Sequence, residues 1–372
     1  MSPQDAGAGM DALVRASLAR GAPWGFLPPS AEARVLAVAA RFPAAATGFF
    51  GFECRPGGHL AETDFLFCTA HGSGEPEALA EALRTAPFGA APWQDLGRFC
   101  TAWSTEATLA ERIENLWLEF DLAGGTSPPS ELPVPSVFVG ARVGGPEAER
   151  LEWLFEAAAL LGGAALPAQV RRAVADCLAT LPEGGTLFQF GLMLSRPARQ
   201  LRLCLRDVPA EQLASMLDAM HWQGARQALA TLVARTEGAE LRLGLDVTDR
   251  VLPRLGMEIR PARPEAAGAM HAALRTFGLA GEEELRELSR WWGLAHQQIL
   301  RAAWDERLAH HPACPGPAHR GAILRNEHHV KITIEEDGAM AAKSYLAARL
   351  VWLTDEQTRT ILRQVRDAKG VQ

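Results

Sequence analysis

Basic residues alternate with apolar ones in several short segments of this chain. Lys331 lies in VKITI and Lys343 in AKSYL, on either side of an Asp-Gly turn signal, while Arg202 and Arg242 each occupy a Leu-Arg-Leu triplet. Alternation of period two is typical of a β-strand, so each basic side chain shares a face with other polar groups and opposes an apolar face. Guanidinium groups match phosphate oxygens in bidentate geometry, and an ammonium adds a point charge. A cluster of these side chains would bind an anion.

Carboxylates fall on the same strand faces. Glu53 lies in FGFECRPG and Glu119 in NLWLEFDLA. A carboxylate held beside a bound substrate is a candidate general base. Ionised groups in a partly dehydrated cavity are costly unless they are paired or bound to a ligand. The alternative to a catalytic role is therefore that these carboxylates pair with the arginines and stabilise a solvated interior.

The strands that carry these residues recur in pairs, with helical stretches between the pairs. The pattern predicts five pairs, whose first strands start near residues 48, 115, 186, 240 and 329. In the last pair, Asp337-Gly338 supplies the backbone freedom of a tight turn. We expect Ser30 to cap the helix that precedes the first pair. The helical stretch before the fifth pair is predicted to run from Glu282 to Leu308.

Ten strands with one apolar face each must bury those faces under helices, which leaves the polar faces on the other side. Closure of the sheet satisfies its edges, and ten strands enclose enough space for a ligand. The predicted fold class is α+β, a ten-stranded antiparallel β-barrel surrounded by helices and built from five αββα repeats. Residues 1–28 are expected to form an N-terminal extension, and residues 29–372 a single barrel domain. The alternative is two separate α+β domains divided near residue 182.

Composition limits the partners of this chain. It has 372 residues, a net charge of -7 and no run of Lys or Arg, which argues against a surface that coats nucleic acid. The N-terminus lacks the basic-then-apolar order of a signal peptide, and there is no uninterrupted apolar run of about 18 residues. Six cysteines are scattered without CxxC spacing, which favours reduced core thiols. We expect a cytoplasmic monomer or homodimer that binds neither nucleic acid nor membrane.

A group of histidines offers a second type of site. His310-His311, Cys314, His319 and His328-His329 lie close together in the sequence and are nominal zinc ligands. Their spacing matches no established zinc pattern, and PACPGPAH is typical of a flexible loop. We therefore expect a solvated loop or lid here instead of a metal site.

An antiparallel ten-stranded barrel of five αββα units resembles the ABBA-type aromatic prenyltransferases, across nearly the whole chain. The layout carries the resemblance, together with Lys343-Ser344-Tyr345, which is similar to the Lys-x-Tyr strand motif with which that family holds a prenyl diphosphate. The resemblance implies transfer of an isoprenyl group from an allylic diphosphate to an aromatic or peptide acceptor inside the barrel, in natural-product biosynthesis or peptide modification. Glu53 looks like the glutamate that accepts the substrate's proton in the indole-modifying branch.

The resemblance implies a role for each group of side chains on the polar strand faces. Glu53 is the first candidate for the base and Glu119 the second. The diphosphate is expected to contact Arg55, Arg202, Arg206, Arg242, Arg254, Lys331, Lys343, Tyr345 and Arg349. The substrate pocket is expected to be lined by Trp117, Phe138, Gln189, Met193 and Glu258.

Two absences qualify the implied chemistry. No aspartate-rich DDxxD box is present, so a metal-bridged diphosphate is disfavoured. We expect no required cofactor and no protein metal site, and the sequence does not decide whether Mg²⁺ takes part. Tyr345 is the only tyrosine, whereas the family typically surrounds the allylic cation with several. Trp117, Phe138 and Met193 could shield the cation instead. A barrel that binds a small molecule or peptide without prenyl transfer, or that catalyses another reaction, remains the alternative.

Overall fold

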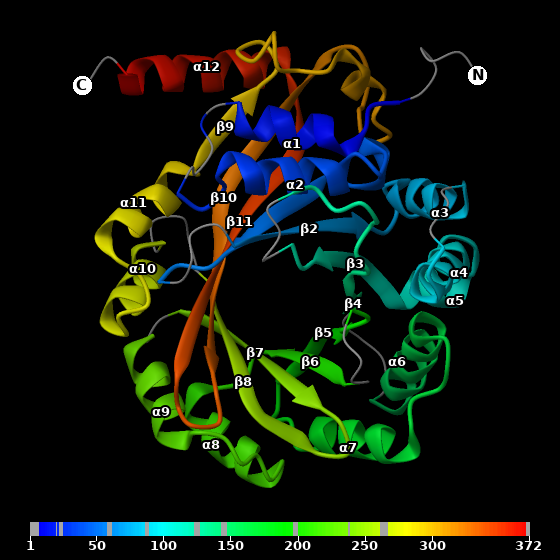
Figure 1. Ribbon diagram of the computed structural model, residues 1–372, viewed down its shortest axis with the longest axis vertical. Helices are drawn as coiled ribbons and strands as arrows, with labels where there is room; N and C mark the ends of the chain where they lie inside the picture. The colour runs from blue at the N-terminus through cyan, green and yellow to red at the C-terminus, as the bar shows by residue number, and fades with distance from the viewer. Residues whose placement is uncertain are drawn as a thin grey trace.

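The computed structural model describes residues 7–19, 21, 25–57, 62–85, 89–122, 127–142, 147–195, 200–236, 239–260 and 267–369. At its centre, β1 to β7 each pair with the next strand in the sequence, β8 pairs with β10, and β11 pairs with both β10 and β1. These antiparallel pairings close the sheet into a ten-stranded barrel (Figure 1). Its strands are β1 (Phe49–Cys54), β2 (Thr63–Ala70), β3 (Ile113–Phe120), β4 (Ser136–Ala141), β5 (Thr186–Leu192), β6 (Leu201–Arg206), β7 (Glu240–Val247), β8 (Val251–Arg260), β10 (His319–Ile334) and β11 (Met340–Thr354).

The closed sheet confirms the predicted barrel. β4 pairs with β5, with Val137 opposite Leu192, so the sheet continues across residue 182 and the alternative of two domains divided there is wrong. Closure leaves the ten barrel strands without a free edge along their paired segments, which removes the tendency of an open sheet to pair with other chains.

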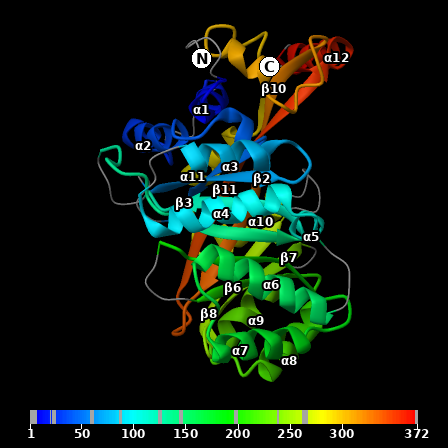
Figure 2. The same ribbon diagram turned by 90° about the vertical axis from the view of Figure 1, so that its right-hand side faces the viewer.

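Helices cover the outside of the barrel in the predicted order (Figures 1 and 2). Apolar strand residues such as Phe52, Leu118, Leu203 and Ile332 have no exposed surface and belong to one hydrophobic core with the helices. The helices are α1 (Met10–Leu18), α2 (Pro29–Ala39), α3 (Glu75–Thr85), α4 (Ala91–Thr105), α5 (Ala107–Arg112), α6 (Glu147–Gly162), α7 (Ala168–Ala179), α8 (Ala210–Ala219), α9 (Arg226–Arg235), α10 (Ala267–Thr276), α11 (Glu282–Arg290) and α12 (Asp355–Lys369).

The described part of the N-terminal segment packs against the barrel. Leu13 and Val14 of α1 are fully buried in the same core, and the Met10 amide donates to the carbonyl of Phe42. Arg325 on β10 donates from Nη1 to the carbonyl of Ser17 at 3.0 Å. The division at residue 28 stays a prediction, but α1 is joined to the barrel by burial in the shared core and by the hydrogen bond from the Arg325 side chain.

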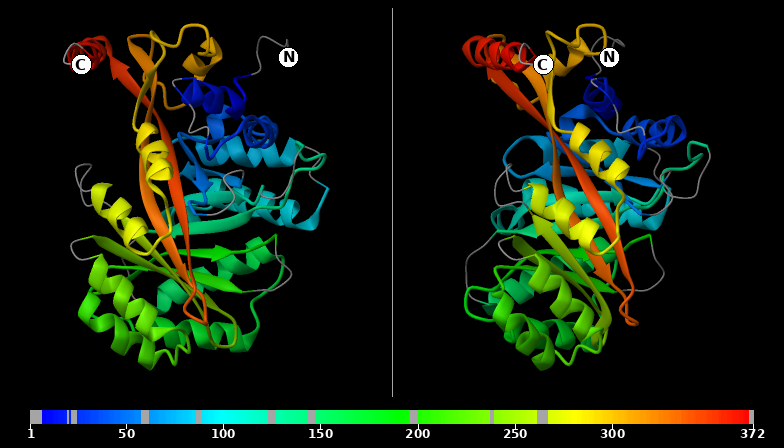
Figure 3. Two further views of the ribbon diagram at one scale, coloured as in Figure 1. Left: turned by 60° about the vertical axis from the view of Figure 1, so that its left-hand side comes forward. Right: turned by 90° about the vertical axis from the view of Figure 1, so that its left-hand side faces the viewer.

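The hairpin β10–β11 spans most of the height of the molecule (Figure 3). Its turn is the predicted one: Gly338 has φ 87°, and Asp337 Oδ1 accepts a hydrogen bond from the Ala339 amide at 2.9 Å. A positive φ is easy for glycine, which has no Cβ. Val330 and Ile332 face the helices, whereas Lys331 faces the lumen, as the alternation predicts.

The predicted helix from Glu282 to Leu308 is wrong. α11 ends at Arg290, a short strand β9 (Gly293–His296) follows, and the segment ends in a 3-10 helix η3 (Glu306–His310). Gly293 has φ 148°, which a helix cannot accommodate. β9 forms because β10 begins at His319, well before residue 329, and this outer part of β10 pairs with β9.

The predicted cap of α2 is also wrong. The helix begins at Pro29, and no side chain caps its first turn. Proline is favoured at a first helical position because its fixed φ suits the helix and its missing N–H would have no partner there. Ser30 therefore lies inside the helix.

Candidate active site

The barrel lumen contains a cavity of about 260 Å³ and, beside it, a smaller one of about 50 Å³. Glu119, Lys331 and Tyr345 line both, so the two cavities meet at these residues. The larger cavity is slightly smaller than the range typical of ligand pockets. It is large enough for a small organic ligand, whereas the smaller one holds only a few waters or a single small group.

Three arginines on adjacent strands form one side of the larger cavity. Arg206 on β6 lies directly opposite Arg242 on β7, and Arg260 follows on β8. The guanidinium carbon of Arg242 lies 4.6 Å from the ring centre of Phe188, and that of Arg206 lies 5.8 Å from it. Burial lowers the pKa of Arg260, and repulsion from Arg242 and Arg206 adds to this effect. We call Arg206, Arg242, Arg260 and Lys331 the cationic wall.

Lys331 is the member of the cationic wall that has no partner of its own. It is 8% exposed, and it makes no hydrogen bond or ion pair with any residue that the structure describes. Its side chain lies over Gly256, where a Cβ would come within 2.6 Å of Lys331 Cε. A buried ammonium is costly unless an anion compensates it. This position therefore favours an anionic ligand.

Aromatic side chains form the opposite side of the larger cavity. Phe49 on β1 and Trp117 on β3 meet edge to face with ring centres 5.0 Å apart. Phe138 on β4 packs in a small apolar cluster inside the barrel, and Gly191 leaves room for its ring. We call Phe49, Trp117 and Phe138 the aromatic wall. Aromatic faces attract cations and bury apolar groups, so this wall suits an aromatic ring or a carbocation.

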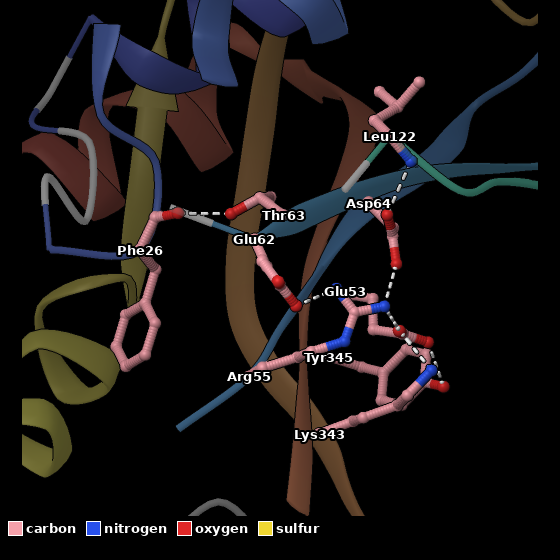
Figure 4. Close-up of polar contacts among 9 residues, drawn as sticks. All are labelled: Phe26, Glu53, Arg55, Glu62, Thr63, Asp64, Leu122, Lys343 and Tyr345. Atoms are coloured by element: carbon pink, nitrogen blue, oxygen red, sulfur yellow. Dashed lines mark hydrogen bonds and ion pairs between the residues drawn. The ribbon is translucent and has the colours of Figure 1, made fainter. Parts of the chain in front are cut away.

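Glu53 lines the smaller cavity and contacts two cations and one hydroxyl group (Figure 4). Lys343 Nζ is 2.5 Å from Glu53 Oε1, and Tyr345 Oη donates to Oε2 at 2.6 Å. Burial alone would raise the pKa of Glu53, but the interactions with Lys343, the Tyr345 hydrogen bond and the Arg55 charge hold it at about 2. Glu53 is therefore firmly ionised and a weak base.

Arg55 connects Glu53 to a second carboxylate (Figure 4). Its Nη2 lies 2.5 Å from Asp64 Oδ2 and 3.4 Å from Glu53 Oε1, and its Nη1 lies 3.6 Å from Glu62 Oε2. Asp64 also accepts from the Leu122 amide at 2.6 Å. Burial and the charge of Glu53 raise the pKa of Asp64 to about 6. Arg55 is thus held by carboxylates of β1 and β2 and is not among the residues described as lining either cavity.

Glu119 has a raised pKa, in contrast to Glu53. Burial and repulsion from Glu53 raise its pKa to about 7, although Lys331, Lys343 and Arg202 oppose the rise. Glu119 lines both cavities, as does Lys331 of the cationic wall. A carboxyl with a pKa near neutrality is well suited to take up and release a proton at physiological pH.

Other predicted anion-binding residues lie away from the larger cavity. Arg202 forms a bidentate ion pair with Asp246, at 2.7 and 2.8 Å, inside the smaller cavity. Arg254 Nε lies 2.8 Å from Glu335 Oε1. Arg349 is exposed and does not belong to the described lining of either cavity. The structure therefore brings Arg206, Arg242 and Lys331 together at the larger cavity and separates the other predicted cations from it.

Four of the five residues predicted to line the substrate pocket lie around the larger cavity. Trp117, Phe138, Gln189 and Glu258 all line the larger cavity. Met193 lines the smaller one, where it packs against Phe138.

The sequence reasoning missed several lining residues. Arg260 lies two residues after Glu258 on β8 and shares its face, so strand alternation alone could have identified it. His328 could not have been found in this way, because β10 has a bulge between Glu327 and His329 that turns both His328 and His329 into the lumen. Phe49 and Phe188 also line the cavity.

Histidine, cysteine and carboxylate side chains do not gather into a metal site in the described part of the chain: no group of three or more could hold an ion. His311, one of the nominal zinc ligands, has its Nε2 within 3.2 Å of the backbone carbonyls of Ala44 and Thr47. None of the described helices is both long and apolar enough to cross a bilayer.

Comparisons with known proteins bear on the fold. No protein-family model matches the sequence, and no curated protein matches it. Among solved structures, the apo form of prenyltransferase PriB is similar over 91% of this chain and 96% of that chain, with 17% identity and a TM-score of 0.52. The 5-dimethylallyltryptophan synthase from Streptomyces coelicolor is 16% identical over 91% of this chain and 97% of that one, with a TM-score of 0.45.

A third similar structure is the 6-dimethylallyltryptophan synthase from Micromonospora olivasterospora in complex with DMASPP and Trp. It is 13% identical, covers 92% of this chain and 98% of its own, and has a TM-score of 0.45. At these identities the likeness concerns the fold and not the substrates. The ten-stranded barrel ringed by helices is the architecture that the resemblance to ABBA-type prenyltransferases implies, and this chain shares it with prenyltransferase PriB.

Proposed function

We propose that this protein is a prenyltransferase that transfers an isoprenyl group from an allylic diphosphate to an aromatic acceptor, either a small molecule or a side chain of a peptide. The observation that carries the proposal is the cationic wall facing the aromatic wall across one cavity. The diphosphate would lie against Arg206, Arg242, Arg260 and Lys331. The isoprenyl chain and the acceptor ring would lie against Phe49, Trp117 and Phe138.

The cationic wall would assist the first step. The bond between the allylic carbon and the diphosphate oxygen breaks, and its electron pair leaves with the diphosphate. Preorganised cations stabilise the charge that develops on the leaving oxygens. Binding a polyanion would also relieve the mutual repulsion of Arg242 and Arg260 that the lowered pKa of Arg260 reflects. We propose that these side chains, and not a protein-bound metal, neutralise the diphosphate.

The second step would join the allylic cation to the acceptor. A carbon of the electron-rich ring forms the new bond, and the proton on that carbon then leaves to a base. We propose Glu119 as this base, in place of Glu53, because its pKa of about 7 makes it the better proton acceptor and because it lines the same cavity as the two walls. Glu53 would instead orient Lys343 and Tyr345, to which it is bonded.

A binding protein without transfer activity is the second candidate. The observation that favours it is the position of Tyr345, the only tyrosine: its ring stacks on His329 with centres 4.0 Å apart, and its hydroxyl is bonded to Glu53. A ring stacked in this way offers the carbocation little of its face. The aromatic wall would then have to shield the cation alone.

Calorimetry with dimethylallyl, geranyl and farnesyl diphosphates tests the anion site. We expect at least one to bind, and Arg242→Gln and Lys331→Met each to weaken binding about tenfold, the effect of losing one charged contact. Arg254→Gln is the matched control, because Arg254 pairs with Glu335 and lies outside the larger cavity. Release of diphosphate together with an isoprenyl mass increase on an aromatic acceptor separates the enzyme from the binding protein. If none of the three diphosphates binds, both steps of the proposal fail.

A further inference from the structure

The bulge in β10 places two histidines side by side in the cavity. Glu327 pairs with Leu346 and His329 with Tyr345, so His328 is the extra residue in the strand. On the outer face, Glu327 accepts from Ser344 Oγ at 2.6 Å and lies 2.7 Å from His271 Nε2 of α10. These two contacts hold the bulge from outside the barrel. A bulge commonly re-aims a side chain in this way.

Arg260 fixes the protonation of the first ring. Its Nη2 lies 3.0 Å from His328 Nε2. A guanidinium has only donors, so His328 Nε2 must carry a lone pair. An imidazole keeps at least one N–H at neutral pH. The proton of His328 therefore lies on Nδ1.

His328 then fixes the second ring. Its Nδ1 lies 2.8 Å from His329 Nδ1. Because His328 Nδ1–H donates, His329 Nδ1 must accept, and the proton of His329 lies on Nε2. Both rings are neutral on this geometry. Burial and neighbouring positive charge act in the same direction, since they lower the pKa of each histidine well below its usual value.

The last N–H in this series of hydrogen bonds, on His329 Nε2, faces the cavity. His329 Nε2 makes no hydrogen bond with any described residue, and Glu258 Oε1 lies 3.9 Å from it, beyond hydrogen-bond distance. The parallel stacking of His329 on Tyr345, at an interplanar angle of 15°, fixes the direction of the ring. An oriented donor without an acceptor is thus presented beside the cationic wall.

We propose that His329 Nε2–H donates a hydrogen bond to an oxyanion of the bound ligand, and that His328 is a positioning residue that holds His329 in this tautomer. The charged groups that face the pair are Arg242, Arg260 and Lys331, opposed by Glu53 and Glu258. Their balance favours an anion. For the identity of the ligand, the inference rests on the proposed function: the oxyanion is a phosphate of the donor or a carboxylate of the acceptor. Neither histidine serves as the base.

Nitrogen-15 NMR of histidine side chains in the ligand-free protein tests the tautomers. We expect the Nδ1–H form for His328 and the Nε2–H form for His329, both neutral at pH 7, with His328→Asn used for assignment. Two Nε2–H rings, or a charged ring, would overturn the inference. This measurement needs no ligand, so it fails or succeeds independently of prenyl transfer.

Two amide substitutions at residue 329 test the donor. His329→Gln places an amide nitrogen near the Nε2 position, whereas His329→Asn places it near Nδ1. We expect His329→Asn to weaken binding of the ligand about tenfold and His329→Gln to restore it to within about threefold, as for one hydrogen bond to a charged group. Near-UV circular dichroism identifies variants that fold.

The probes are inorganic pyrophosphate and indole-3-acetate, each titrated by calorimetry. A selective loss of pyrophosphate binding in His329→Asn assigns the oxyanion to the donor, and a selective loss of indole-3-acetate binding assigns it to the acceptor. Equal binding by both variants, or no binding of either probe to the unmodified protein, overturns the inference. Dependence of pyrophosphate binding on His329 without any prenyl transfer would sustain this inference while refuting the proposed function.

Discussion

At the scale of single residues, neighbouring groups shift the pKa values of two glutamates in the lumen in opposite directions. Glu53 is held near pKa 2 by Lys343 and Tyr345, whereas burial and the Glu53 charge raise Glu119 to about 7. Pairs of carboxyl groups whose pKa values diverge in this way commonly have different roles. The family resemblance made Glu53 the first candidate for the base, but neither the resemblance nor strand alternation reveals the partners that surround a carboxylate.

Glu119→Gln should reduce turnover by a factor of about 10² to 10⁴, the usual contribution of a general base. The base form is the ionised one, so turnover of the unmodified protein should fall as the pH drops below about 7. Steady-state rates with dimethylallyl diphosphate between pH 5 and 9 measure both effects. Asp121→Asn is the control, since Asp121 lines only the smaller cavity. Unchanged turnover in Glu119→Gln would remove this residue from the mechanism.

The same substitution should stabilise the fold at alkaline pH. The pKa of Glu119 is higher in the folded state than in the unfolded state. The free energy of unfolding therefore falls as the pH rises from about 4.5 to about 7, because the folded state resists ionisation of this carboxyl group. Removing the charge should therefore increase the free energy of unfolding by about 3 kcal/mol at pH 8 and by close to zero at pH 4. Urea unfolding at the two pH values checks this. Equal stabilisation at both would contradict the electrostatic explanation.

At the scale of elements, adjacent strands make room for one another's side chains. Lys331 on β10 lies over Gly256 on β8. A Cβ added at the neighbouring Gly244 on β7 would lie 3.7 Å from Lys331 Nζ. Neither glycine has a positive φ. These glycines are therefore present for the space that they leave, and not for the conformation that they allow.

Gly256→Ala should displace the Lys331 ammonium, because its Cβ would come within 2.6 Å of Lys331 Cε. We expect diphosphate affinity to fall about tenfold, with little loss of stability because the end of a lysine side chain moves easily. Gly244→Ala is the matched control, since its contacts of 3.7 to 3.8 Å are ordinary. Calorimetry on the two variants decides the matter, and equal affinities would show that the position of Lys331 is unimportant.

Glu327→Ala should destabilise the barrel at the β10 bulge. Glu327 is fully buried and bonded to Ser344 and His271, and both would lose a charged partner. We expect a loss of about 3 kcal/mol in the free energy of unfolding. Glu336→Ala in the exposed turn should change it by less than about 0.5 kcal/mol. A small effect at Glu327 would mean that the bulge does not depend on this network.

Particular elements show where sequence reasoning reached its limit. Strand alternation placed Lys331, Arg206 and Arg242 correctly in the lumen, because period two is preserved wherever one face is buried. It failed at His328, where one inserted residue breaks the period. It also failed after Arg290, because β9 exists only to pair with the outer part of β10, a long-range contact that no local pattern encodes.

At the scale of the whole molecule, ten strands and their helices enclose one cavity with a cationic wall and an aromatic wall. The walls come from different parts of the chain: β1, β3 and β4 supply the aromatic rings, and β6, β7, β8 and β10 supply the cations. Closure of the sheet is what brings them face to face. The proposed chemistry therefore depends on the barrel as a unit.

The most direct test is a crystal structure of the protein soaked with dimethylallyl thiodiphosphate, an analogue that resists ionisation. We expect both phosphorus atoms beside Arg206, Arg242, Arg260 and Lys331, and the dimethylallyl group against Trp117 and Phe138. Density for the diphosphate in the smaller cavity beside Arg202 and Asp246, or outside the barrel, would contradict the proposed site.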